Sequence, residues 1–385
     1  MTKTVLFIIF LHFPFLDKFS WKEYPKKCQL IILLNTEVFL LKKLIVTCLC
    51  ASFLLTGCQT SEKETVSSKT EKYSTQIFAM DTVMDISVYD QDDSVLTEVS
   101  DLIKELDHNL STTNKESEIY KLNQEKQASL SKSTSELLQL GLTFCQKTNG
   151  ALDLSIYPVV QSWGFTTDTY RIPSPDEIHT LLENVDYSKI LFSSEEQSVS
   201  IPEQMEIDLG SVAKGYTGNK IVELLKNHGI TSALLNLGGN VQVLGNKPDG
   251  SSWNVGIQDP LSDDYLGSLF VTDSAVITSG GYERYFEDEN GNVYWHIIDP
   301  STGYPARSGL ISATAIGPDG AYCDALSTSL FIMGKEKAEQ FWKENQDFEM
   351  ILISENKEVF ITSGIADSFQ LMDHSPYSLN IISPN

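Results

Sequence analysis

Three short segments of the chain carry side chains that could act together in phosphoryl chemistry. The first runs from Asp208 to Gly215 and places an acid, a glycine turn and Lys214 at the start of an expected helix. A helix N-terminus beside a lysine suits an anion such as phosphate, because its free N–H groups and its dipole favour negative charge. Most turns of this kind only connect a strand to a helix, so this segment alone is a weak signal.

The second segment runs from His296 to Pro300 and is followed by Thr302-Gly303. Two apolar residues between His296 and Asp299 predict a strand that carries the histidine toward its end, and then a Pro-Gly turn. Histidine has a reference pKa of about 6.5 and can take and return protons near neutrality. A lone histidine on a strand is nevertheless more often structural than catalytic.

The third segment, Cys323 to Thr328, contains Asp324 and two hydroxyl side chains. If it is helical, Asp324 and Thr328 share a face with Ser327. A carboxylate with hydroxyls beside it suits Mg²⁺, while the alternative is an Asp that only favours the helix dipole. Together the three segments offer an anion site, magnesium ligands and a base, which are the parts that phosphoryl transfer needs.

Familiar nucleotide and hydrolase motifs do not account for these segments. The sequence has no G-x-S-x-G elbow and no G-x-G-x-x-G fingerprint. Gly210 to Gly215 has the glycine spacing of a P-loop, but Tyr216 stands where the lysine is required. The P-loop interpretation therefore fails.

The elements that must position these residues alternate irregularly between helix and strand. Apolar spacing predicts helices at 95–110, 117–123, 133–148, 176–182, 211–228, 321–333 and 335–345, with Ser211 as an N-cap and Gly229 as a stop. Strands are predicted at 77–89, 205–209, 232–237, 241–244, 253–258, 275–278, 293–298 and 310–316, with a turn at Gly238-Gly239. This order predicts an α+β (mixed α/β) fold.

Composition limits the class of protein and its partners. The chain has 385 residues, is 41% hydrophobic and carries a net charge of −24, which argues against nucleic acid and makes a metal ion necessary for binding a polyanion. Residues 77–385 are enough for one large domain. Of the six cysteines, Cys145 and Cys323 lie in patterns that look helical, and no C-x-x-C pair exists. We expect two buried thiols, with a single bridge as the alternative.

The amino end has the pattern of an exported lipoprotein. Lys42-Lys43 precede an apolar run at 44–55, which is shorter than the roughly 20 residues that span a bilayer and fits a signal peptide. Residues 55–58, Leu-Thr-Gly-Cys, resemble a lipobox. We therefore expect a signal peptide at 1–57, a lipid on Cys58, a flexible polar tether through 76, and a place on the extracytoplasmic face of the cell membrane. The alternative is a short buried helix ending at a stray cysteine.

Residues 1–40 fit this pattern poorly, because signal peptides normally begin at their positive charges. We hypothesise that translation starts near Leu40 or Leu41 and that residues 1–40 are not translated in vivo.

At this point the motifs resemble a known family, the ApbE family of FAD:protein FMN transferases. The matches extend from Met80 to about Gly334 and are 79–85 (AMDTVMD), Asp153 with Pro158 and 163–165 (WGF), 207–216 (IDLGSVAKGY), 236–240 (NLGGN), 278–284 (TSGGYER), 296–303 and 324–328. So many motifs in the same order are far more specific than any one of them.

The resemblance implies a single large domain of two closely packed lobes with a flavin cleft. It also implies an enzyme that transfers FMN from FAD to a Thr or Ser hydroxyl of an extracytoplasmic acceptor protein, with Mg²⁺, and releases AMP. Carried over by position, the FAD contacts are Met80, Thr113, Ala151, Leu152, Asp153, Asp208, Lys214 and Ile298. The Mg²⁺ ligands are the Ser211 carbonyl, Asp324, Ser327 and Thr328, and the base is His296.

Three positions depart from the family pattern: Asp81 replaces a frequent Gly, Ser211 replaces Ala, and Ser327 stands where some members have a second Asp. Two other functions fit the same residues. The protein could be a pyrophosphatase that hydrolyses FAD to FMN and AMP, or a lipoprotein that binds FAD without chemistry. A passive carrier needs no base, so His296 argues against the carrier.

Overall fold

The computed structural model describes residues 71–90, 93–167 and 169–384. These residues belong to one compact unit, 68–385. The predicted signal peptide, Cys58 and the tether up to residue 70 lie outside the described residues. None of the described helices is both long enough and apolar enough to cross a bilayer.

The largest sheet of the described chain has nine strands in the order β1-β2-β6-β7-β10-β13-β14-β15-β17. All neighbours are antiparallel except β15 and β17. The strands are β1 (Glu71–Ala79), β2 (Thr82–Asp90), β6 (Ala233–Leu237), β7 (Asn240–Leu244), β10 (Ser274–Gly280), β13 (Leu310–Gly317), β14 (Glu349–Ser354), β15 (Glu358–Thr362) and β17 (Ser378–Ile382).

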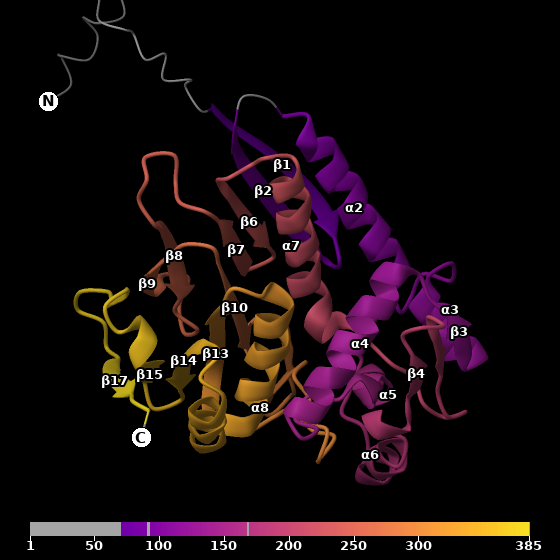
Figure 1. Cartoon of the computed structure of the whole chain (residues 1–385). Coiled ribbons are helices and arrows are strands. Elements are labelled where there is room, and N and C mark those ends of the chain that lie inside the picture. The colour runs from indigo at the N-terminus through magenta and orange to yellow at the C-terminus, as the bar shows by residue number, and fades with distance from the viewer. Residues whose placement is uncertain (1–70, 91–92, 168, 385) are drawn as a thin grey trace, which may run out of the picture. The chain divides into compact units, whose positions relative to one another are not determined.

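Three long helices cover one face of this sheet (Figure 1): α2 (Val95–Leu110), α7 (Gly210–Asn227) and α8 (Gly320–Asn345). Apolar side chains of α2 and α7 pack on β1, β2 and β6, and those of α8 pack on β10, β13 and β14. A small sheet of β16 (Phe369–Leu371), β9 (Tyr265–Val271) and β8 (Trp253–Gln258) covers the other face. Burial on both faces explains why the central strands are almost wholly apolar.

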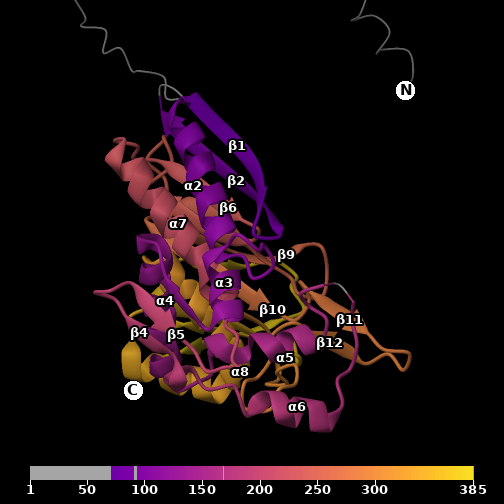
Figure 2. The same ribbon diagram turned by 90° about the vertical axis from the view of Figure 1, so that its right-hand side faces the viewer.

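Residues between α2 and α7 form a mainly helical part with its own core. It contains α3 (Glu118–Glu125), α4 (Lys132–Lys147), η5 (Leu154–Ile156), α5 (Tyr157–Ser162), α6 (Pro175–Leu182), η6 (Tyr187–Lys189) and the small sheet of β3 (Gln127–Ser129), β5 (Ser198–Ser200) and β4 (Leu191–Ser193). An aromatic cluster joins α5 and α6 to the hairpin of β11 (Tyr285–Glu287) and β12 (Val293–Trp295). The two helices and the hairpin lie side by side in Figure 2. The mixed α/β fold is confirmed.

Several predicted elements match closely. Helix α2 has the predicted bounds, α8 breaks at Gly334 (φ 75°), and Gly238 and Gly239 form the turn between β6 and β7 with φ of 64° and 93°. Gly229, with φ of 80°, follows the end of α7. These features depend on local signals, namely apolar periodicity and glycine at positive φ.

The predicted strand at 77–89 is wrong, because the chain turns back at Met80 and Asp81 to form the hairpin β1–β2. Both turn residues have positive φ, 49° and 58°, a conformation usually marked by Gly or Asn. Neither Met80 nor Asp81 is Gly or Asn, so the sequence does not mark the turn. Strand β1 also includes residues 71–76, so the tether ends earlier than predicted.

Two predictions around α7 are also wrong. The segment 205–209 has no regular secondary structure and belongs to no strand; instead the Asn123 side chain accepts from Ile207 N (2.8 Å) and donates to its carbonyl (2.9 Å). Helix α7 begins at Gly210 after Leu209, so Ser211 is not its N-cap. The predicted strand 293–298 ends at Trp295, and Ile298 makes only one bridge, to Pro305.

Candidate active site

The centre of the site is the contact between the first turns of α7 and α8. Gly215 N donates to Asp324 Oδ2 (2.8 Å), and Asn240 Nδ2 donates to Asp324 Oδ1 (3.0 Å). A Cβ on Gly215 would lie 2.2 Å from the Gly320 carbonyl oxygen and 2.7 Å from Asp324 Cβ. Only glycine therefore allows the two helices to approach this closely.

Asp324 is 4% exposed and has no cation within 4.0 Å in the described chain. Burial raises the pKa of its carboxyl group, while the charge of Lys214 opposes that change. A buried carboxylate without an ion-pair partner is unfavourable unless a cation is bound beside it. Asp324 is therefore suited to a metal ion.

Hydroxyl groups cluster one turn further along α8 from Asp324. Ser327 Oγ donates to the Asp324 carbonyl (2.9 Å) and lies 2.8 Å from Ser279 Oγ, which is 3.2 Å from Thr328 Oγ1. Sequence reasoning assigned no role to Ser279, although it lies in the matched motif 278–284. Its position at the end of β10, beside Gly280, was the signal that could have found it.

These oxygens fit Mg²⁺ better than a soft metal. In a regular helix the Gly215 N–H would donate to the Ser211 carbonyl. Here it donates to Asp324, so the Ser211 carbonyl has lost all or part of its usual hydrogen bond. The described ranges contain no cluster of three or more His, Cys, Asp or Glu side chains. An ion here would depend on one carboxylate, neutral oxygens and water, which is how Mg²⁺ is usually held.

His296 follows β12, and both its backbone N (3.1 Å) and its Nδ1 (3.2 Å) approach the Arg284 carbonyl. A carbonyl can only accept, so Nδ1 carries the proton and Nε2 keeps its lone pair. Burial, with smaller effects of Arg284 and Lys214, lowers the pKa of His296 to about 4. The imidazole is therefore neutral at pH 7, as a general base must be.

The three sequence segments converge electrostatically. Burial raises the pKa of Asp208, and the positive charges of Lys214 and Arg284 oppose that change. The same two cations lower the pKa of His296. Lys214 also acts on Asp324, so the charge of this one side chain reaches groups from all three segments. That Asp208, His296 and Asp324 line one space around Lys214 stays a prediction.

Glu283 is a further acidic group of this space that sequence reasoning left without a role. Burial raises the pKa of its carboxyl group to about 6; Lys214 opposes this, and repulsion from Asp324 adds to it. Glu283 lies in the same matched motif as Ser279.

Met80 lies in the turn between β1 and β2, and Thr113 lies in the loop after α2. Met80 N donates to Asp107 Oδ1 (2.8 Å), and Met80 Sδ is 3.7 Å from Thr217 Oγ1 on α7. The Thr113 side chain is exposed. Their contacts with FAD stay predictions.

At three other predicted FAD contacts the side chain is already engaged within the protein. Leu152 is buried in the helical core, and Ile298 is buried in the aromatic cluster. Asp153 accepts from Ser155 N (2.8 Å), Ser155 Oγ (2.6 Å) and Tyr187 N (3.1 Å). Contacts at these positions, and at the neighbouring Ala151, would therefore be made mainly by the backbone.

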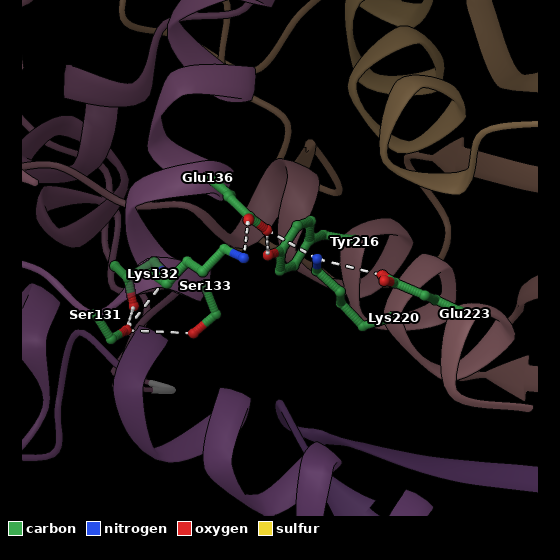
Figure 3. A network of polar contacts seen from close by, with 8 residues as sticks. Ser131, Lys132, Ser133, Glu136, Tyr216, Lys220 and Glu223 are labelled. Atoms are coloured by element: carbon green, nitrogen blue, oxygen red, sulfur yellow. Dashed lines mark hydrogen bonds and ion pairs between the residues drawn. The ribbon is translucent and has the colours of Figure 1, made fainter. Parts of the chain in front are cut away.

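Tyr216, which occupies the P-loop lysine position, has a structural role instead. Its hydroxyl donates to Glu136 Oε2 (2.9 Å) on α4, and Lys220 Nζ binds the same oxygen at 2.8 Å (Figure 3). The hydrogen bond from Lys220 lowers the pKa of Glu136. This network fixes α7, which carries Lys214, against α4.

Both described cysteines, Cys145 and Cys323, are free and buried, as expected for apolar thiols. A groove of about 640 Å³ beside β3, β4 and β5 contains none of the predicted site residues. The predicted flavin cleft between two lobes stays a prediction.

Comparison with known proteins identifies the family. Residues 80–352 match the ApbE family. The FAD:protein FMN transferase of Treponema pallidum is 33% identical over 300 residues, 73% of this chain and 82% of the relative. That of Klebsiella pneumoniae is 30% identical over 307 residues, 78% of this chain and 95% of the relative.

Solved structures agree with the sequence relatives. The ApbE protein of Thermotoga maritima superposes with a TM-score of 0.71 at 30% identity, covering 75% of this chain and 96% of that one. The flavin transferase ApbE of Vibrio cholerae gives 0.70 at 26% identity, covering 78% and 99%. This chain therefore belongs to the ApbE family.

Proposed function

We propose that the protein transfers FMN from FAD to a Thr or Ser hydroxyl of an acceptor protein and releases AMP. The observation that carries this proposal is the contact of His296 Nδ1 with the Arg284 carbonyl at 3.2 Å, which leaves the lone pair on Nε2. The charge of Lys214 reaches this ring, which supports a place for His296 beside the phosphates. Passive binding of a flavin would not need a base in that position.

In this reaction His296 Nε2 takes the proton of the acceptor hydroxyl while the hydroxyl oxygen attacks the phosphorus of the FMN half of FAD. The bond from that phosphorus to the oxygen bridging to AMP breaks, and AMP leaves with this oxygen. Lys214 and the N-terminus of α7 bind the negative phosphates and hold them in line for attack.

Mg²⁺, when bound, would neutralise charge on the pyrophosphate and on the leaving AMP. Asp324, Thr328, Ser327 and the Ser211 carbonyl would hold it, with Ser279 as a supporting hydroxyl. The net charge of −24 supports this metal requirement, because a polyanion would otherwise be repelled.

The test is to incubate the protein with FAD, Mg²⁺ and a candidate acceptor, and to look for flavin fluorescence that survives denaturing electrophoresis. We expect a labelled acceptor and one AMP for each FMN transferred, with no label when EDTA is present. Free FMN without labelled protein would indicate a hydrolase. Unchanged FAD with a range of acceptors would contradict both enzymatic functions.

We also propose that the protein is anchored through a lipid on Cys58 at the extracytoplasmic face of the cell membrane. The basic, apolar and Leu-Thr-Gly-Cys pattern at 42–58 supports this. Since β1 begins at Glu71, the tether would extend from residue 59 to 70. Labelling with a radioactive fatty acid should succeed in the parent and fail in a Cys58→Ala variant, whereas equal labelling would contradict the proposal.

A further inference from the structure

Arg284 connects the base of the site with the hairpin turn at Met80-Asp81. Its carbonyl accepts from the backbone N and from Nδ1 of His296, at 3.1 and 3.2 Å. Its guanidinium Nη2 lies 3.8 Å from Asp81 Oδ2. One residue therefore has its main chain at the catalytic histidine and its side chain at the edge of the site.

The ion pair with Asp81 is weak. Its length exceeds that of a hydrogen bond, and the two side chains are 42% and 84% exposed. Exposed pairs of this kind add little to stability. The guanidinium is therefore available to a stronger anion.

The charge of Arg284 also reaches residues of the candidate site. It acts on Asp208 and His296, the same groups that Lys214 acts on. Lys214 itself has no carboxylate within 4.0 Å in the described ranges. Lys214 thus has no close carboxylate partner in the described chain, and Arg284 has the long, exposed pair with Asp81.

We propose that the guanidinium of Arg284 is a second phosphate ligand for FAD, in addition to Lys214, and that Asp81 pairs with it in the free enzyme until FAD displaces the carboxylate. The inference rests on the proposed function, since it assumes that FAD is the substrate. Arginine suits this role because its planar fork can bind two phosphate oxygens at once. The Arg284 carbonyl meanwhile positions His296, so phosphate binding and orientation of the base involve one residue.

Asp81 supplies the carboxylate that competes for Arg284. Its turn conformation, with φ of 58°, is one that glycine adopts more easily. An acid here competes with phosphate for Arg284. Removing its charge should therefore strengthen FAD binding, provided that Arg284 is present.

The experiment measures binding of FAD and of riboflavin, which has no phosphate, by quenching of flavin fluorescence without an acceptor. The proteins are the parent, Arg284→Ala, Arg284→Lys, Asp81→Asn and the double variant Asp81→Asn/Arg284→Ala. Lys337→Ala, a charge change at an exposed position of α8, is the control. Thermal unfolding midpoints establish that each variant is folded.

We expect Arg284→Ala to weaken FAD binding about ten- to hundredfold, as for loss of a charged hydrogen bond, and to leave riboflavin binding unchanged. Arg284→Lys should recover part of the loss, and Lys337→Ala should match the parent. Asp81→Asn should tighten FAD binding severalfold, and this gain should vanish in the double variant.

Equal loss of FAD and riboflavin in Arg284→Ala, or a gain from Asp81→Asn that persists without Arg284, would overturn the proposal while leaving the transferase function intact. A parent that does not bind FAD would overturn both.

Discussion

The two sides of the candidate site are built in opposite ways. On one side, Asp324 is buried between α7 and α8, and both of its oxygens accept hydrogen bonds from the protein. On the other side, Arg284 and Asp81 lie in exposed turns and share one long ion pair. His296 belongs to the second side, with its ring held by the main-chain carbonyl of Arg284.

This difference indicates a division of roles. The helix side is rigid because glycine contact and buried hydrogen bonds allow one arrangement, which suits a metal ion with strict geometry. On the loop side the long ion pair between Arg284 and Asp81 can be exchanged for other contacts. This suits a surface that must bind FAD and then the acceptor protein. Changes on the helix side should therefore affect stability and activity together, and changes on the loop side should affect activity alone.

The largest effect is expected from Asp324→Ala. Its loss removes the carboxylate for Mg²⁺, which should lower kcat at least about a thousandfold. It also leaves Gly215 N–H and the Asn240 amide without an acceptor, which should cost about 1–3 kcal/mol of unfolding free energy. Turnover and urea denaturation measure the two effects, and a variant with parental activity in Mg²⁺ would contradict the metal assignment.

His296→Ala should lower kcat about 10²- to 10⁴-fold, the usual contribution of a general base. FAD affinity and the unfolding midpoint should stay close to those of the parent, because the side chain makes one hydrogen bond. Single-turnover labelling of the acceptor measures the first quantity and fluorescence quenching the second. Labelling at the parental rate would show that another group takes the proton.

Gly215→Ala tests the spacing of α7 and α8 without removing any proposed metal ligand, because it changes no polar group. The new Cβ would lie 2.2 Å from the Gly320 carbonyl oxygen, so α7 and α8 must move apart, at a cost of about 1–3 kcal/mol. Activity should fall with stability because Asp324 shifts. A variant that is as stable and active as the parent would show that the helix contact tolerates a methyl group.

The loop side can be tested through the pH dependence of kcat/KM. His296 acts as a base only when unprotonated, so with its pKa at about 4 the rate should be constant near neutrality and fall as pH drops toward 4. The charge of Arg284 lowers this pKa, so Arg284→Ala should move the acidic limb to higher pH while its carbonyl remains in place. A limb that does not move would show that the guanidinium does not act on His296.

Ser211→Ala should have the smallest effect. Only the carbonyl of Ser211 is assigned to the metal, and the variant keeps it. We expect kcat and the Mg²⁺ requirement to stay within about twofold of the parent, and stability within about 0.5 kcal/mol. A large loss of Mg²⁺ affinity would show that the hydroxyl is a ligand.

The sequence alone determined features that depend on neighbouring residues. Apolar periodicity set the bounds of α2, and Gly229 and Gly334 marked the end of α7 and the break in α8. The order of polar motifs predicted Asp208, Lys214, His296 and Asp324 as one site and indicated the family that the comparisons confirm. These signals are local or depend on side-chain chemistry, and both can be read from a linear chain.

Only the tertiary structure decided which groups from distant elements meet. The turn at Met80-Asp81 has no glycine to mark it, and the segment 205–209 looks like a strand but is satisfied by the Asn123 side chain. Ser279 and Asn240 reach the Asp324 cluster from separate strands, and Arg284 reaches both His296 and Asp81. Such contacts follow from sheet order and helix packing, which short-range patterns do not encode.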